Sequence, residues 1–157
     1  MRHGPGGVVL LLAAALLAGC SSVPVRTHDE RISGKSFRRP VAGPVSSSFG
    51  HRPGGRHDGI DIPAPPGTPV LAAERGIVAY SGNGMRGYGN AVILDHGDGI
   101  RTLYGHLDTI RAKPSELVPA GEPVGTVGRT GNATTPHLHF ELRVDGEPVD
   151  PLRYLER

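Results

Sequence analysis

Hydrophobic and polar residues alternate most clearly between residues 137 and 144. Side chains along a β-strand point alternately to opposite faces, so this alternation predicts a strand with one apolar and one polar face. The apolar face consists of Leu138, Phe140, Leu142 and Val144. The polar face consists of His137, His139, Glu141 and Arg143. We therefore expect one face to pack in the core and the other to carry chemistry.

Other short apolar stretches are separated by glycine- and proline-rich turns and predict further strands. Residues 91–95 and 100–107 form the clearest predicted hairpin, connected through residues 96–99. Residues 45–49 predict another short strand. After residue 20 no segment shows sustained apolar spacing of 3.6 residues, which excludes a predominantly helical fold. The sequence therefore predicts an all-β domain.

Two similar short motifs occur in the chain. Residues 66–70 (Pro-Gly-Thr-Pro-Val) and residues 120–124 (Ala-Gly-Glu-Pro-Val) each combine a turn with the start of a short strand rich in glycine and valine. This repetition resembles the half-barrel repeat of lipoyl and biotinyl carrier domains, although neither half carries the lysine that those domains modify. We therefore expect a duplicated half-barrel element without a carrier function.

Length and composition bound the number of domains and the class of partner. With 157 residues, of which 37% are hydrophobic, the chain can bury one ordinary core. The 24 glycines and 15 prolines agree with short strands and many tight turns. A formal net charge of +2 is too small to indicate nucleic-acid binding, despite an isoelectric point near 9.0. We expect one domain with no nucleic-acid partner.

The first 19 residues have the pattern of a secretory signal peptide. An apolar run at residues 8–17 follows a basic start and is too short to span a bilayer. It leads into Leu-Ala-Gly-Cys at residues 17–20, which resembles a bacterial lipobox in which Cys20 is acylated after cleavage. Cys20 is the only cysteine, so no internal disulfide is expected. Ser21 after it resembles the pattern that directs lipoproteins to the outer membrane, facing the periplasm.

The remaining chain divides into a tether and a folded domain. Residues 20–40 are polar, are rich in arginine and show no apolar periodicity, which is typical of a linker. We therefore expect a lipidated tether over residues 20–40 and the folded domain over residues 41–157.

Two pairs of residues are candidates for metal binding or catalysis. His137 and His139 lie two apart on the strand described above, about 6.5 to 7 Å between Cα atoms, so both rings can reach one ion. His57 and Asp61 can share that ion only if the chain bends between them, because a straight strand would separate them by about 13 Å. Gly59 permits this bend. Spacing alone does not decide which member of the pair at 137 and 139 is a ligand.

The predicted hairpin contributes one more candidate. Alternation along its second strand places Thr102, Tyr104 and His106 on one face, opposite Leu103 and Leu107. His106 is therefore expected on a polar face, like the histidine pair. His96 neighbours Gly97 in the predicted turn, so we interpret it as a turn residue.

Two familiar motifs are excluded by their context. Residues 82–87 match the glycine pattern of dinucleotide-binding proteins, but the chain continues directly into the predicted strand at 91–95 instead of a helix. No His-Glu-x-x-His helix is present, so the sequence offers no glutamate base of that type. We expect Glu141 to support the site from outside the ligand set.

Taken together, three motifs in order resemble a known family. His57-x-x-x-Asp61, Tyr104-x-His106 and His137-x-His139 are similar to the zinc metallopeptidases of the lysostaphin (LytM) type, over residues 41 to the C-terminus. The resemblance implies that His57, Asp61 and His139 bind Zn²⁺ and that His106 and His137 are catalytic residues outside the ligand set. It also implies antiparallel sheets that form a groove, with the duplicated half-barrel element noted above.

The resemblance further implies a function. Three protein ligands leave one position of a tetrahedral zinc open for water, which is typical of a catalytic site. The expected activity is a zinc-dependent endopeptidase that hydrolyses peptide cross-links of bacterial peptidoglycan. The alternative is a non-catalytic activator of cell-wall amidases, since some relatives have lost zinc ligands. The expected partners are peptidoglycan stem peptides and, through the lipid anchor, the membrane of the cell envelope. The sequence leaves open whether a protein regulator controls the site.

Overall fold

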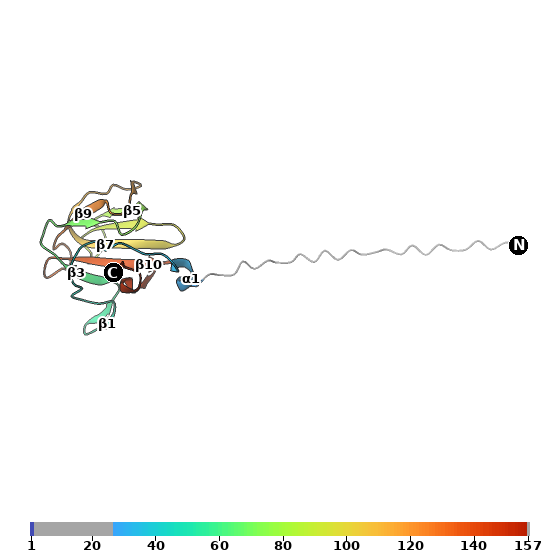
Figure 1. The fold of residues 1–157 in the computed structure, drawn as a ribbon, viewed down its shortest axis with the longest axis horizontal. Helices are drawn as coiled ribbons and strands as arrows, with labels where there is room; N and C mark the ends of the chain where they lie inside the picture. The colour runs from blue at the N-terminus through green and yellow to red at the C-terminus, as the bar shows by residue number, and fades with distance from the viewer. Residues whose placement is uncertain (2–26, 157) are drawn as a thin grey trace.

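The computed structural model describes Met1 and residues 27–156 (Figure 1). Apart from Met1, the signal peptide predicted for residues 1–19 lies outside the described residues, and so does the lipidation site predicted at Cys20. Both remain predictions. Within the described part of the chain, no helix has the length and apolar character needed to cross a membrane.

The described chain is almost entirely β-structure, which confirms the all-β prediction. It contains one short helix, α1 (His28–Ile32), and one 3₁₀ turn, η1 (Pro151–Arg153). The strands are β1 (Gly50–Arg52), β2 (Gly55–His57), β3 (Ile60–Pro63), β4 (Pro69–Leu71), β5 (Gly76–Gly82), β6 (Asn90–Asp95), β7 (Ile100–Ile110), β8 (Leu117–Val118), β9 (Pro123–Val127), β10 (His137–Val144) and β11 (Glu147–Val149). Extended chain predicted as a strand at 45–49 instead forms an isolated bridge from Ser47 to Asp61, and β1 begins at Gly50.

All strand pairs named here are antiparallel. The main sheet has nine strands, with the order β11-β10-β7-β6-β5-β8. β3 pairs with β10, while β9 joins β7 and carries β4 on its other edge. β1 and β2 form a separate hairpin that projects from the main body (Figure 1). The long strands β7 and β10 therefore lie side by side at the centre of the fold.

The two faces of β10 differ as the sequence predicts. Leu138, Phe140, Leu142 and Val144 are at most 1% exposed and belong to the hydrophobic core. Directly opposite Phe140 on β7 lies Tyr104, with 5.4 Å between the ring centroids. On the polar face, His137, His139 and Glu141 are buried as well, while Arg143 is partly exposed.

Strand β7 corrects one prediction. Tyr104 does not share a polar face with His106; it is fully buried in the core together with Leu107. Its hydroxyl accepts the Ala73 N–H at 2.8 Å and the hydroxyl hydrogen of Thr102 at 3.0 Å, which makes burial of the polar tip favourable. Between Tyr104 and Leu107 the pairing with β6 gains one residue on β7, and His106 there has a φ of 61°. This β-bulge turns His106 away from the core and towards the opposite side.

The strands that follow the two similar motifs at residues 66–70 and 120–124 pair with each other in the fold. β4 and β9 pair with each other, and the turns before them contain Gly67 and Gly121, with φ of 81° and 82°. Each glycine N–H donates to the partner half, Gly67 to the carbonyl of Val127 at 2.9 Å and Gly121 to that of Ala72 at 2.8 Å. Positive φ values of this kind favour glycine, which accounts for its place in both motifs. The expected duplicated element is therefore present.

The described part of the expected tether packs on the domain, so its boundary at residue 40 is corrected. Ile32 at the end of α1 and Phe37 are each 1% exposed and belong to the core. Phe37 also forms a parallel bridge with Leu155 through backbone hydrogen bonds at 2.9 and 2.8 Å. Isolated apolar residues in a polar segment give no periodic signal, and their partners lie at the far end of the chain. Only the tertiary structure therefore reveals this packing.

This packing gives a stability prediction. Replacing Phe37 by Ala should lower the free energy of unfolding by about 3 to 5 kcal/mol, because it removes a buried aromatic ring and leaves a cavity. Chemical denaturation followed by circular dichroism would measure this difference. Leu117→Ala is the control, since Leu117 is 50% exposed and should cost less than about 1 kcal/mol. Equal losses in the two variants would mean that residues 27–40 do not contribute to the folded domain.

Candidate metal centre

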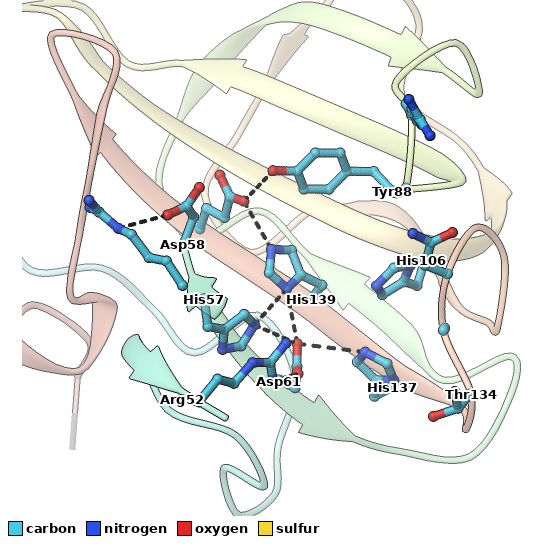
Figure 2. A pocket seen from close by; sticks show the side chains of 15 residues that line it. Arg52, His57, Asp58, Asp61, Tyr88, His106, Thr134, His137 and His139 are labelled. Atoms are coloured by element: carbon cyan, nitrogen blue, oxygen red, sulfur yellow. Dashed lines mark hydrogen bonds and ion pairs between the residues drawn. The ribbon is translucent and has the colours of Figure 1, made fainter. Parts of the chain in front are cut away.

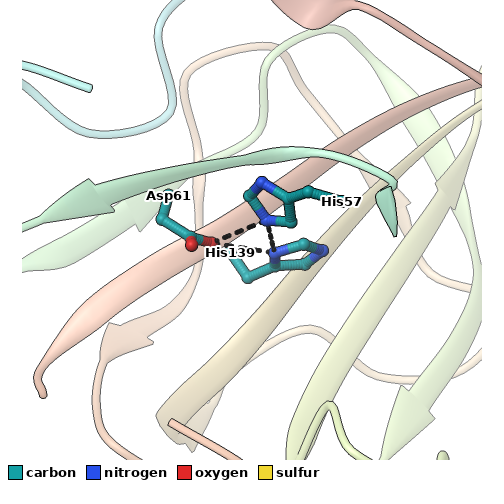
Figure 3. A group of neighbouring side chains, drawn as sticks. All are labelled: His57, Asp61 and His139. Carbon is teal, nitrogen blue, oxygen red and sulfur yellow. Dashed lines mark hydrogen bonds and ion pairs between the residues drawn. The ribbon is translucent and has the colours of Figure 1, made fainter. Parts of the chain in front are cut away.

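Three side chains from three strands converge on one point (Figure 3). His57 ends β2, Asp61 lies in β3 and His139 lies in β10. Asp61 and His139 are directly opposite each other in the antiparallel β3–β10 ladder, so their side chains share a face. The chain bends at residues 58–59 between β2 and β3, as predicted, which brings His57 back over Asp61. A Cβ atom at Gly59 would overlap the carbonyl oxygen of Phe140, so the close approach requires glycine.

The potential ligand atoms lie close together. His57 Nε2 is 3.2 Å from Asp61 Oδ1 and 3.1 Å from His139 Nδ1. His139 Nδ1 is 2.9 Å from Asp61 Oδ1. Ligands about 2 Å from a tetrahedral zinc ion would be about 3.3 Å apart, so small side-chain movements are enough to accommodate the ion. The three residues can therefore hold a metal ion.

Hydrogen bonds on the outer sides of both imidazoles orient their lone pairs. His57 donates its Nδ1–H to the carbonyl of Ser48 at 2.9 Å, and His139 donates its Nε2–H to Glu141 at 3.0 Å. In neutral imidazole the other ring nitrogen is then an acceptor. His57 Nε2 and His139 Nδ1 both face Asp61 Oδ1, so a proton or a metal ion between these atoms makes the arrangement favourable.

The charges of the surroundings also favour a cation. Burial lowers the pKa of His139, but its hydrogen bonds to Asp61 and Glu141 and the charges of these carboxylates outweigh burial and raise the pKa to about 9. Burial raises the pKa of Asp61, yet the hydrogen bond to His139 and the nearby imidazoles outweigh this effect, so the pKa is lowered. The centre therefore stabilises positive charge placed between the two residues.

A second carboxylate, Glu141, holds the His139 ring in place through a buried network of hydrogen bonds. Glu141 has no exposed surface and accepts hydrogen bonds from His139, from Tyr88 Oη at 2.7 Å and from Arg143 Nε at 2.6 Å. The Tyr88 ring also packs against the His139 ring at 5.6 Å between centroids. The position expected for Glu141, beside but outside the ligand set, agrees with this geometry. Tyr88 was not singled out from the sequence, because only the fold brings its loop over β10.

His106 and His137 stand beside the three potential ligands (Figure 2). Their ring centroids are 4.8 Å apart, and His137 Nε2 is 3.6 Å from Asp61 Oδ1. Each ring donates its Nδ1–H to a backbone carbonyl at 2.8 Å, His106 to Thr130 and His137 to Thr135. Both rings therefore keep Nε2 available for a bound molecule. Burial, together with the neighbouring His137 and His139, lowers the pKa of His106 to about 4.

All five predicted side chains line one groove of about 490 Å³. The other lining residues are Arg52, Arg56, Asp58, Arg86, Gly87, Tyr88, Asn132, Ala133, Thr134 and Glu141. His96 does not line this groove; its ring bonds the Arg75 carbonyl and the Thr102 hydroxyl, both at 2.8 Å. The fold therefore separates His96 from the five grouped residues.

Comparison with known proteins identifies the family. The model of peptidase family M23 matches residues 55–151, which is more than half of the chain. The protein belongs to peptidase family M23. This confirms the resemblance to the lysostaphin type that the three motifs indicate.

Solved structures agree with the M23 assignment. The lysostaphin catalytic domain of Staphylococcus simulans is 33% identical, with a TM-score of 0.67, over 71% of this chain and 91% of that domain. A zinc-containing peptidase from Vibrio cholerae is 35% identical, with a TM-score of 0.68, over 75% of this chain and 40% of that one. The M23 match at residues 55–151 contains all five grouped residues.

Relatives within the M23 family carry two kinds of name. The murein hydrolase activator NlpD of Escherichia coli is 42% identical over 76% of this chain and 31% of its own length. The DD-carboxypeptidase/endopeptidase Mpg of Neisseria meningitidis is 44% identical over 69% of this chain and 26% of its own length. The chain thus spans about a third or less of these relatives. One of these relatives is thus named as an activator of murein hydrolases and the other as a carboxypeptidase and endopeptidase.

The buried network gives a prediction for metal affinity. Glu141→Gln should weaken zinc binding about 10- to 100-fold, because the amide is a poorer acceptor for the His139 Nε2–H that orients the ring. Competition with a chromogenic chelator measures the affinity, and thermal unfolding shows whether the variant folds. Glu147→Gln on β11 is the matched control, since Glu147 is exposed and outside the groove. Unchanged zinc affinity in folded Glu141→Gln would show that Glu141 does not orient His139.

Proposed function

We propose that this M23 domain is a zinc-dependent endopeptidase that hydrolyses peptide cross-links of bacterial peptidoglycan. The observation that supports it is a complete set of five side chains in one groove, with His57, Asp61 and His139 as ligands and His106 and His137 beside them. Two imidazoles and one carboxylate are a ligand set that suits zinc and leaves room for water and substrate. Bound zinc would supply Lewis-acid polarisation of the scissile carbonyl and lower the pKa of water.

His106 and His137 would perform the proton transfers. Their Nδ1–H groups are fixed on backbone carbonyls, so each ring presents Nε2 to the groove in a defined orientation. A neutral imidazole in this position can take a proton from the attacking water, and the resulting imidazolium can protonate the leaving amine. The protonated ring also donates a hydrogen bond to negative charge that develops on the carbonyl oxygen. The near-contact of the two rings allows them to share these tasks.

The second candidate function is activation of a separate wall hydrolase without catalysis. It is favoured by the 42% identity to NlpD, which is named a murein hydrolase activator. An activator needs a surface for its partner but does not need two oriented imidazoles beside a three-ligand centre. The complete groove of this chain is the reason for placing hydrolysis first.

Location in the cell envelope is part of the proposal. The wall-associated names of the relatives support the envelope as the site of action. We propose in addition that Cys20 carries a lipid that anchors the protein to the outer membrane, facing the periplasm. Such an anchor would hold the domain near its peptidoglycan substrate.

The ligand assignment predicts the zinc content of three variants. The wild type should bind about one zinc ion per chain, while Asp61→Ala and His139→Ala should lose most of it, because each change removes one of three protein ligands. Metal analysis after dialysis checks this outcome. His96→Ala is the control histidine and should retain zinc. If both ligand variants keep wild-type zinc, the assignment is incorrect.

The catalytic assignment predicts a separation of zinc binding from turnover. His106→Ala and His137→Ala should keep zinc and lose about 10²- to 10⁴-fold in hydrolysis, the usual cost of losing a general acid or base. Release of peptides from purified wall sacculi, measured beside zinc content, tests both properties. A chelator should abolish wild-type release.

Three outcomes of this experiment would count against the assignment. Near-wild-type hydrolysis by both variants would reject the mechanism. Zinc loss from His137→Ala with zinc retained in His139→Ala would mean that these two residues exchange roles. If the wild type releases nothing but stimulates a wall amidase, and both variants still stimulate it, the activator function is correct.

A further inference from the structure

The groove has two walls of different construction on either side of the potential ligands. Figure 2 shows Arg52 and Asp58 on one side, and His106 and Thr134 on the other. The first wall comes from the β1–β2 hairpin and the bend after it. The second wall comes from the loops at residues 83–89 and 131–135, which contribute Arg86 and Asn132 to the groove. Any extended peptide that places a bond beside His106 and His137 must lie against this second wall.

The charged groups of the groove are mostly compensated by one another. Arg56 pairs with Asp58, with 3.1 Å between Nε and Oδ1. Arg52 donates to Ser47 at 2.6 Å and is 3.7 Å from Asp61. Glu141 accepts hydrogen bonds from Arg143 and His139, and the Asp61 carboxylate contacts the imidazoles of His57 and His139. None of these groups offers a free charge to a ligand.

Arg86 is the exception among the charged groove residues that the structure describes. It is exposed, and no described residue forms a hydrogen bond or ion pair with its guanidinium. The side-chain amide of Asn132 beside it is likewise exposed and has no hydrogen-bond partner among the described residues. The second wall therefore presents one uncompensated cation and one neutral donor to whatever occupies the groove.

The backbone that carries Arg86 is held in place. The Asn132 N–H donates to the carbonyl of Gly87 at 2.9 Å, which joins the two loops directly next to Arg86. The His106 N–H donates to the carbonyl of Tyr88 at 2.8 Å, which ties the same loop to the bulge that carries His106. The loop that carries Arg86 is thus fixed relative to His106, and Arg86 lines the same groove as His106 and His137.

We propose that Arg86, assisted by the Asn132 amide, binds a free carboxylate of the substrate peptide and so selects acidic peptides over their carboxamide forms. The inference rests on the proposed function, since it assumes that the groove takes a peptide. A guanidinium presents two parallel N–H groups that match a carboxylate, whereas a neutral carboxamide offers only one acceptor and no charge. The specificity is therefore for the carboxylates of the stem peptide next to the cleaved bond.

The test compares two synthetic cross-linked stem peptides that differ only in having a carboxylate or a carboxamide beside the cleaved bond. Zinc-loaded full-length wild type should prefer the carboxylate about tenfold in kcat/KM, the factor expected for one hydrogen-bonded charge pair. Arg86→Ala should remove this preference by raising KM for the carboxylate peptide, with kcat and zinc content unchanged. Arg86→Lys should restore part of it, because the charge remains without the planar fork.

Arg111→Ala is the matched control, because Arg111 is an exposed arginine outside the groove. It should keep the wild-type preference. The inference is overturned if Arg86→Ala retains the preference, or if it weakens cleavage of both peptides equally.

A binding measurement distinguishes carboxylate recognition by Arg86 from hydrolysis by the domain. Isothermal titration of the same two peptides into the wild type and Arg86→Ala, each also carrying His106→Ala so that the peptides stay intact, measures recognition without hydrolysis. If the wild type cleaves neither peptide but binds the carboxylate form more tightly, and Arg86→Ala abolishes the difference, Arg86 recognition holds and the hydrolase proposal fails. If the wild type cleaves the peptides without preferring the carboxylate, the hydrolase proposal holds and Arg86 recognition fails. Equal or undetectable binding of both peptides overturns Arg86 recognition.

Discussion

The antiparallel pairing of β3 with β10 is the constraint on which the metal centre depends. It sets Asp61 directly opposite His139, so that a carboxylate and an imidazole from distant parts of the sequence face the same point. A slip by one residue would move Asp61 to the core face, because side chains alternate along a strand. Gly59 helps to prevent such a slip, since only a residue without a side chain fits against the carbonyl of Phe140. The bend that returns His57 to the site begins at the same glycine.

Burying the polar face of β10 costs desolvation free energy. Hydrogen bonds around Glu141 offset this cost. Glu141 is fully buried as a charged group, but three donors satisfy its oxygens, and Arg143 supplies the opposite charge. At the next position towards the groove, nitrogen atoms of His57 and His139 and an oxygen atom of Asp61 face one another. Buried groups arranged in this way destabilise the folded protein unless a proton or a metal ion lies between them. A cation bound between these groups therefore stabilises the folded protein.

A backbone irregularity in β7 brings His106 and the adjacent loop into place. A regular β7 would direct His106 into the core beside Tyr104, but the bulge at φ 61° turns it towards the groove. The His106 N–H then donates to the Tyr88 carbonyl, and the Asn132 N–H donates to the Gly87 carbonyl, so the bulge holds one loop and that loop holds the other. Family M23 includes relatives named as an activator and as an endopeptidase, and their common scaffold does not separate these functions. The proposal of hydrolysis for this chain rests on its five groove side chains rather than on its fold.

Much of the fold and of the site could be predicted from local patterns in the sequence. Alternation identified β10 and its two faces, turn residues identified the hairpin of β6 and β7, and the spacing of His57 and Asp61 required the bend that the structure contains. These predictions succeeded because each depends on residues only a few positions apart. The packing of Phe37, the reversal of Tyr104 and the position of Tyr88 over Glu141 could not be predicted in this way. Phe37 and Tyr88 depend on contacts between segments far apart in the chain, and Tyr104 depends on an extra residue that only pairing with β6 reveals, so the tertiary structure alone decides them.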